Sequence, residues 1–95
     1  MTLFLSHNGF ALRFDSWNNE FAIHMITHTG FEFGRFTKCP ERAKQIFLER
    51  SPSTPEHKVN KAIESALEQR DQDRIINGFT HLLLEPFLSD IRNKV

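Results

Sequence analysis

Apolar and polar residues alternate through much of the first forty residues. Every second residue is large and apolar from Phe10 to Phe14 and again from Phe21 to Met25, which is the period of a strand with one buried face. Asn8-Gly9 lies between the first two apolar segments and is a strong signal for a two-residue hairpin turn, because both residues tolerate a positive φ. We therefore predict a four-stranded antiparallel meander over residues 2–37.

The fourth segment, Phe31–Phe36, breaks this alternation. One extra residue in a bulge at Gly34 would restore it, because glycine inside a strand often marks a bulge. With that bulge, Phe31, Phe33 and Phe36 would share one face. We predict that this is the inner face of the sheet, together with the large apolar residues of the second and third strands.

The second half of the chain has the apolar spacing of three and four residues that is typical of helices. Thr54 precedes Pro55, a pattern that indicates a helix N-cap followed by proline at the first helical position, and one apolar stripe runs from Val59 to Leu67. The stripe stops over residues 68–74, which are expected to form either a turn or an exposed helical bridge, and Pro86 is expected to end or kink a helix. The prediction is therefore three to four helices, over about 41–50, 55–69, 72–85 and 86–93.

Together these elements predict an α+β fold in one domain, residues 1–95, with the helices packed on one face of the sheet. A chain of 95 residues is long enough for one hydrophobic core. The predicted core consists of Phe10, Leu12, Phe14, Phe21, Ile23, Phe31, Phe33, Phe36, Ile46, Phe47, Val59, Ile63, Leu67, Phe79 and Leu83.

Composition excludes several classes of protein. The 12 basic and 12 acidic residues cancel, and each half of the chain is separately neutral, so no charge excess points to a polyanionic partner. No apolar run is long enough to span a membrane, and the first ten residues lack the basic start of a secretory signal. The single cysteine, Cys39, cannot form an internal disulfide, which favours a reducing, cytoplasmic location.

Candidate catalytic and metal-binding residues lack a supporting pattern. His24 and His28 have a ligand spacing that works on a helix, but four residues of a strand span roughly 13 Å, too far for two ligands of one zinc ion. Nothing near Cys39 supports a role as a nucleophile, and the sequence has neither a nucleophile elbow nor a glycine-rich phosphate loop. We therefore predict no metal, no cofactor and no enzymatic activity.

A nucleic-acid hypothesis depends on Arg13, His24 and Arg35. All three are expected on the outer face of the sheet, and a sheet face with arginines and aromatic residues is how several RNA-binding domains stack bases. The phenylalanines, however, are expected on the opposite face, and the net charge is zero, so the electrostatic attraction would be weak. A nucleic-acid-associated regulator is therefore the alternative function.

Apolar residues near the C-terminus exceed what one face of a helix needs. Residues 82–84 are all leucine, and further apolar residues follow Pro86, which would turn them in a different direction from the preceding stripe. A helix that is apolar on several sides is either buried or part of an interface. We predict an interface with another protein or with a second copy of the chain at Leu84, Phe87, Leu88 and Ile91.

The function that best fits these features is a small non-enzymatic protein-binding module. Short standalone chains of this kind, such as bacteria and their mobile elements encode, act as inhibitors, antidotes or regulatory adaptors of other proteins. The expected partner is another protein or, in a homodimer, a second copy, and no membrane contact is expected. An accessory subunit of an enzyme complex is a third hypothesis.

Overall fold

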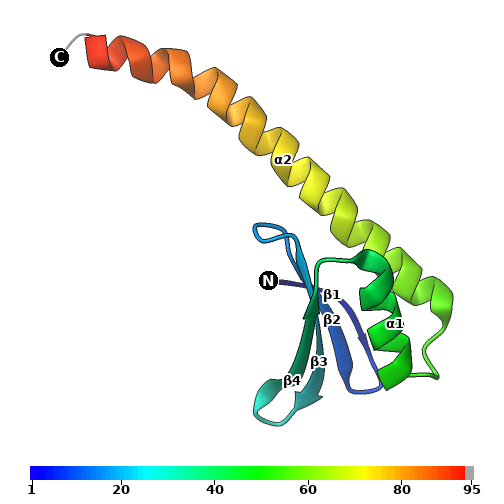
Figure 1. Ribbon diagram of the computed structural model, residues 1–95. Helices are drawn as coiled ribbons and strands as arrows, with labels where there is room; N and C mark the ends of the chain where they lie inside the picture. Colours follow the sequence, from blue (N-terminus) through cyan, green and yellow to red (C-terminus); the bar gives the residue numbers. More distant parts are fainter. Residues whose placement is uncertain (94–95) are drawn as a thin grey trace.

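The computed structural model describes the backbone of residues 1–93 and the side chains of residues 1–75. Four strands form one antiparallel sheet in the order β1-β2-β3-β4, and the helices lie on one side of that sheet (Figure 1). The predicted α+β class and the four-stranded antiparallel sheet are therefore confirmed. The elements are β1 (Thr2–His7), β2 (Phe10–Asp15), β3 (Glu20–Thr27), β4 (Gly30–Thr37), α1 (Pro40–Arg50) and α2 (Glu56–Asn93).

Short turns join the strands. Asn8 and Gly9 adopt φ values of 51° and 79°, as required by the mirror-image turns that match the twist of a hairpin. In the next turn, the Asp15 carboxylate accepts hydrogen bonds from the backbone N–H groups of Trp17 and Asn18 at 3.0 and 3.2 Å. These bonds, above all the one from the Asn18 backbone, hold the pKa of Asp15 below its ordinary value. The Asp15 carboxylate therefore stabilises the β2–β3 turn.

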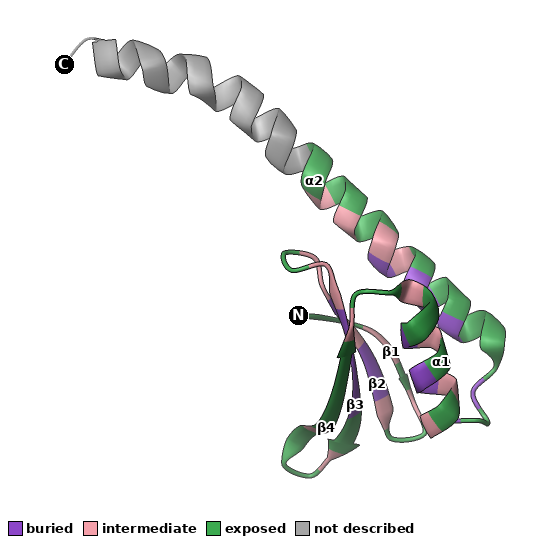
Figure 2. Cartoon of the chain, viewed as in Figure 1, coloured by how far each residue is buried: buried purple, intermediate pink, exposed green. Residues whose placement is uncertain are grey.

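The inner face of the sheet carries the large apolar residues of β2 and β3. Pairing places Leu12 opposite Ile23 and Phe14 opposite Phe21, and the centroids of the two phenyl rings lie 4.5 Å apart. The helices cover these residues, so the buried segments of β2 and β3 face those of α1 and the first part of α2 (Figure 2). The helical part of the core consists of Ala43, Ile46, Phe47, Val59, Ala62, Ile63 and Ala66.

Much of the predicted core is confirmed. Phe10 and Leu67 are partly buried against it, whereas Phe79 and Leu83 lie outside the described side chains. The predicted core residues that are buried are Leu12, Phe14, Phe21, Ile23, Ile46, Phe47, Val59 and Ile63.

The phenylalanines of β4 are the exception, because all three are exposed. The predicted bulge is present, with Phe33 at a φ of 54° next to Gly34. It does bring Phe31 and Phe36 to one face, but this is the outer face, since Phe31 pairs with the outward-facing Ile26. The two-residue turn between β3 and β4 fixes this register, and a register shift of one residue would move every side chain to the other face. Their predicted place in the core is therefore wrong.

Two helices replace the three to four that were predicted. Helix α2 is continuous through residues 68–74, in agreement with the helical-bridge alternative, and does not end at Pro86. The separate helices predicted over about 55–69, 72–85 and 86–93 are therefore one helix. Residues 68–74 are rich in Glu, Gln and Arg, which favour helix even without an apolar stripe. The loss of the stripe therefore marks the point where α2 stops packing on the sheet, rather than the end of the helix.

Helix α2 continues well past the sheet that it covers (Figure 1). Near its middle, Arg70 Nη1 donates a hydrogen bond to Asn19 Oδ1 in the β2–β3 turn at 2.9 Å. The next apolar residue, Ile75, is exposed. The Cα radius of gyration is accordingly 18.1 Å, whereas a compact chain of this length has about 12 Å.

Among the described residues, no helix combines the length and the apolar character that crossing a membrane requires.

Candidate functional site

The side of the sheet that faces away from the helices forms a continuous surface, which we call the outer face. Strand pairing assigns residues to it in rows: Leu3, Arg13, Ala22 and Phe36 form one row, because each is opposite the next across β1 to β4. The outer face consists of Leu3, Ser6, Ala11, Arg13, Asp15, Glu20, Ala22, His24, Ile26, Phe31 and Phe36.

Small residues occupy the centre of the outer face, and a long side chain crosses above them. Ala11 and Ala22 have no exposed surface although no helix covers them. The Arg13 guanidinium carbon lies 4.3 Å from the centroid of the Phe31 ring, a cation–π distance. Arg13 lies in the row of Ala22, whereas Phe31 lies opposite Ile26, further along β3. The Arg13 side chain must therefore extend across the row between them, which contains His24. The face is therefore covered by its own side chains.

His24 lies beneath this layer. Its side chain is only 8% exposed, and its ring centroid is 5.9 Å from that of Phe31 and 5.5 Å from that of Phe36. Its Nδ1 atom is buried and has no hydrogen-bond partner. Burial, and then the charges of Arg13 and Arg50, lower the pKa of His24 below its ordinary value. His24 is therefore a neutral, packed imidazole at neutral pH.

Gly34 is the residue of the bulge that makes room for His24. A Cβ atom at position 34 would lie 2.6 Å from His24 Nε2 and 3.1 Å from a ring carbon of Phe36. The imidazole and a side chain at position 34 cannot occupy that space together. The glycine predicted to allow a bulge thus also allows the close packing of His24 against β4.

Arg50 at the end of α1 holds the bulge from the other side. Its Nη1 atom donates hydrogen bonds to the backbone carbonyl oxygens of Ile23 at 3.2 Å and of Phe33 at 2.6 Å. These bonds satisfy carbonyls where the regular β3–β4 ladder is interrupted. Sequence reasoning missed this role, because only the three-dimensional fold brings α1 to the bulge.

Large apolar side chains surround the covered centre. Leu3 is 48% exposed, Ile26 38%, Phe31 44% and Phe36 55%. They come from β1, β3 and β4, so they span the whole width of the sheet. Exposed apolar side chains therefore border the outer face on three of its four strands.

Two opposite charges on the outer face have no ion-pair partner among the described residues. Glu20 and Arg13 lie on neighbouring strands, two positions apart in register, yet neither takes part in a salt bridge. Arg13 stacks on Phe31 instead, and the nearby Asp15 is engaged in the β2–β3 turn. The outer face therefore carries one arginine and two carboxylates, and none of the three forms an ion pair within the described part of the chain.

The residues predicted for nucleic-acid contact are only partly brought together. Arg13 and His24 lie on the outer face, as expected, but Arg35 pairs with Ile23 and so belongs to the opposite side of β4. The interface predicted at Leu84, Phe87, Leu88 and Ile91 lies outside the described side chains.

The exposed phenylalanines of the outer face were missed by sequence reasoning, although a signal for them existed. Ile26 is out of phase with the inward-facing Phe21, Ile23 and Met25 in the alternation of the third strand, so it faces outward. The two-residue turn that follows places Phe31 directly opposite it. The turn length therefore determines the face of Phe31.

A second polar cluster ties the β1–β2 turn to the loop between α1 and α2. The Thr54 hydroxyl oxygen lies 2.8 Å from His7 Nδ1 and 2.7 Å from Ser51 Oγ, and Asn8 Nδ2 donates to the hydroxyls of Ser51 and Ser53. Thr54, predicted as a helix N-cap, uses its hydroxyl in this cluster, and α2 begins two residues later. Ser51 and Thr54 are buried, so the cluster stabilises the loop and presents neither hydroxyl as an accessible nucleophile.

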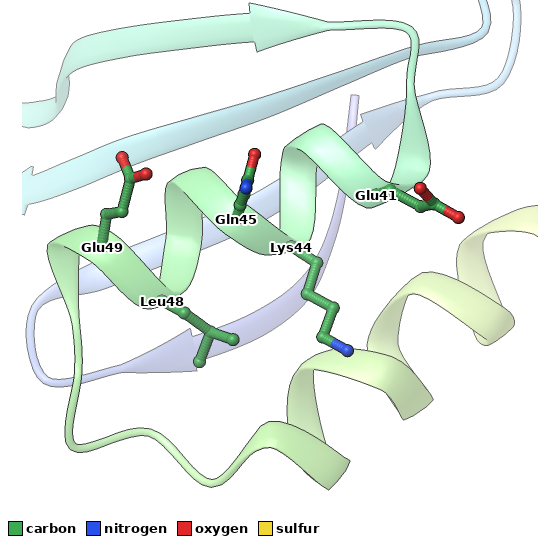
Figure 3. A pocket seen from close by; sticks show the side chains of 5 residues that line it. All are labelled: Glu41, Lys44, Gln45, Leu48 and Glu49. Atoms are coloured by element: carbon green, nitrogen blue, oxygen red, sulfur yellow. The ribbon is translucent and has the colours of Figure 1, made fainter.

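The hollows on the helical side are shallow and charged. One of about 300 Å³ lies along α1, where charged and polar side chains surround Leu48 (Figure 3). A second, of about 310 Å³, lies between α1 and α2. Lys44 lines both hollows and forms an ion pair with Glu56 at 2.6 Å. The hydrogen bond from Lys44, and then its positive charge, lower the pKa of Glu56 below its ordinary value. Both hollows are open to solvent, whereas a ligand site is enclosed enough to bury most of its ligand.

In the described part of the chain, we see no group of residues arranged for metal binding or for thiol chemistry. No group of three His, Cys, Asp or Glu residues there could hold a metal ion. Cys39 is exposed at the N-cap position of α1 and makes no side-chain capping bond. The outer face is therefore the strongest candidate functional surface.

Comparison with protein-family models, with curated proteins and with solved structures found no match to this chain. Its function is therefore argued from its own residues.

Proposed function

We propose that this chain is a small non-enzymatic protein-binding module that docks its partner on the outer face. The observation that carries the proposal is the set of exposed apolar side chains, Leu3, Ile26, Phe31 and Phe36, around Arg13. Phenylalanine and arginine are enriched at the centres of protein interfaces, where lysine and acidic residues are depleted. The two phenylalanines and the arginine of the outer face therefore support a protein interface, although Asp15 and Glu20 lie at one end of the same face.

The outer face is also organised before any partner binds. Stacking on Phe31 restrains Arg13, and packing around the imidazole of His24 restrains Phe36. Side chains that are already ordered lose less entropy on association. This preorganisation supports a docking role.

Within this class, we propose an inhibitor, an antidote or a regulatory adaptor. Such proteins act by covering a surface of their partner, which requires a rigid, complementary face and no chemistry of their own. An accessory subunit of an enzyme complex would use the same face in the same way.

The nucleic-acid alternative is supported by one observation. Phe31 and Phe36 are exposed beside Arg13, and single-stranded nucleic acids stack their bases on aromatic side chains in this way. The carboxylates of Asp15 and Glu20 share the outer face, however, so the basic excess that drives binding to phosphates is missing. Protein binding is therefore the better-supported function.

Affinity capture from native extract tests this proposal with two matched variants. Phe36→Lys places a charge in the outer face, and Trp17→Lys makes the same kind of change in the β2–β3 turn, where Trp17 is 88% exposed. We expect wild type and Trp17→Lys to retain one protein in stoichiometric amount and Phe36→Lys to lose it. Capture that is unchanged by Phe36→Lys would contradict the proposal. Retention of nucleic acid that increases with the added lysine would support the alternative.

A further inference from the structure

We infer that the partner adds an extended segment to the edge of β4 as a fifth strand, with apolar and acidic side chains in alternation. This inference rests on the proposed function and adds the chemical class of the partner. Strand β4 is the last in the sheet order, and no other described element lies beside it on the side away from β3 (Figure 1). An edge strand presents main-chain N–H and C=O groups that another extended chain can pair.

Strand pairing shows which main-chain groups of β4 face this edge. The backbone N–H of Ile26 donates to the carbonyl oxygen of Gly9 at 2.7 Å, on the β2 side of β3. Main-chain groups of successive strand residues point to opposite sides, so the neighbours of Ile26, and every second residue beyond them, face β4. The β4 residues opposite them are Gly30, Glu32, Arg35 and Thr37. The main-chain groups of Phe31 and Phe36 therefore point to the outer edge of the sheet.

The bulge between Phe31 and Phe36 leaves this edge open. A single nitrogen, Arg50 Nη1, donates to the carbonyl oxygens of Ile23 and Phe33, so the gap between β3 and β4 is filled from within the chain. From Phe31 to Phe36, the extra residue of the bulge leaves four strand positions, which span about 13 Å. One extended segment of the partner can therefore reach the main-chain groups of both phenylalanines.

The outer-face side of β4 favours apolar residues in the added strand. Phe31 and Phe36 are exposed there, and apolar side chains opposite them would form the cross-strand pairs that stabilise sheets. Strand β4 has neither the lysine nor the proline that commonly protect an edge. The other edge strand, β1, contacts α2, and its Phe4 and Leu5 are partly buried against the core. Of the two edges, β4 is therefore the more open to a partner.

The helical side of β4 favours an acidic residue in the added strand. Arg35 is exposed on that side, opposite Ile23, and forms no ion pair within the described part of the chain. Glu32, on the same side, already accepts a hydrogen bond from the Thr29 hydroxyl. A carboxylate of the partner opposite Arg35 would form a cross-strand pair of opposite charge. Because successive side chains of a strand face opposite sides, the partner segment alternates apolar and acidic residues.

Amide hydrogen exchange followed by NMR tests the inference with a defined probe, a peptide of about eight residues in which valine and glutamate alternate. In the free protein, the amides of Phe31 and Phe36 should exchange faster than those of Glu32 and Arg35, which face β3. When the probe occupies half of the protein, exchange at Phe31 and Phe36 should slow about twofold. Exchange at Glu32 and Arg35 should not change.

A second peptide, in which valine and lysine alternate, tests the predicted charge. It should bind about three- to tenfold more weakly than the first, because lysine then meets Arg35. In the variant Arg35→Glu the preference between the two peptides should reverse. Equal affinity of the wild type for both peptides would contradict the acidic character of the partner segment.

A proline variant tests the main-chain pairing itself. Phe36→Pro removes the N–H that faces the edge, a position at which edge strands tolerate proline. Phe36→Ala removes the same ring but keeps the N–H, so it is the matched control. We expect Phe36→Pro to be folded by circular dichroism and to lose the probe, and Phe36→Ala to retain measurable binding. Equal binding by the two variants would overturn the added strand. If Phe36→Pro does not fold, amide exchange in the wild type decides.

The outcomes separate this inference from the proposed function. Unchanged exchange at Phe31 and Phe36 with about 1 mM probe would overturn the added strand, while capture with Phe36→Lys would still decide the proposed function. Slower exchange at both amides, together with capture that Phe36→Lys leaves unchanged, would support the added strand and contradict docking on the outer face.

Discussion

The two faces of the sheet carry aromatic residues in different environments. On the inner face, Phe21 has no exposed surface because α1 and α2 pack against it. On the outer face, Phe31 and Phe36 are 44% and 55% exposed. The residue type is the same, and the position of the helices makes the difference. The aromatic residues of a strand thus show which of its faces are apolar. They do not show which of those faces the helices of the same chain cover.

The largest expected effect separates the two faces directly. Phe21→Ala should lower the free energy of unfolding by about 3–5 kcal/mol, because it leaves a cavity in the core. Phe36→Ala should lower it by less than about 1 kcal/mol, because the ring is half exposed. Urea unfolding followed by circular dichroism measures both. Equal losses would mean that Phe36 is part of the core of the monomer.

A smaller effect is expected at the bulge between the faces. Gly34→Ala should cost about 1–3 kcal/mol of unfolding free energy, because its Cβ would lie 2.6 Å from His24 Nε2. The two closest contacts are both with the His24 side chain, so the variant His24→Ala should relieve most of the clash. In a double-mutant cycle we therefore expect Gly34→Ala to cost clearly less in the His24→Ala background. Costs that simply add would show that the penalty at Gly34 comes from elsewhere.

The free energy of unfolding is also expected to depend on pH, because of His24 on the outer face. Burial, then Arg13 and Arg50, lower the pKa of His24 below the ordinary value of 6.5. Between the folded and unfolded pKa values the unfolded chain binds more protons, so stability rises with pH in that window. The stabilising effect of neutral His24 is complete above about pH 6.5 and is lost as the pH falls through the lowered pKa.

Unfolding by urea between about pH 5 and about pH 7.5 measures this dependence. His24→Gln should reduce the loss of stability on acidification. His28→Gln, in the exposed β3–β4 turn, serves as the matched control and should leave the loss unchanged. A slope that is identical in His24→Gln and wild type would contradict the buried, neutral imidazole.

The sheet could be predicted from sequence to a large extent. Alternation fixed the inner residues of β2 and β3, and Asn8-Gly9 predicted the first hairpin correctly. The face of Phe31 was predicted wrongly because aromatic residues were grouped together by type. The outward position of Ile26 and the length of the next turn would have placed Phe31 outside, since hairpin register is fixed by the turn.

The helices and the rest of the site were less predictable. The stop in the apolar stripe at residues 68–74 is compatible with either a turn or an exposed helical bridge, and the Glu, Gln and Arg residues there favour the helix. The stacking of Arg13 on Phe31 and the bonds from Arg50 to the bulge depend on contacts between distant segments. Periodicity along the chain does not contain that information.

The central claim is that the inner face is the core of the folded chain and the outer face is its docking surface. The most direct test follows the backbone amide signals of the wild type by NMR as the protein captured from native extract is added. We predict shifts at Arg13, His24 and Phe36 on the outer face, with the amides of α1 unchanged. Signals that stay constant throughout, or shifts confined to α2, would contradict this account of the outer face.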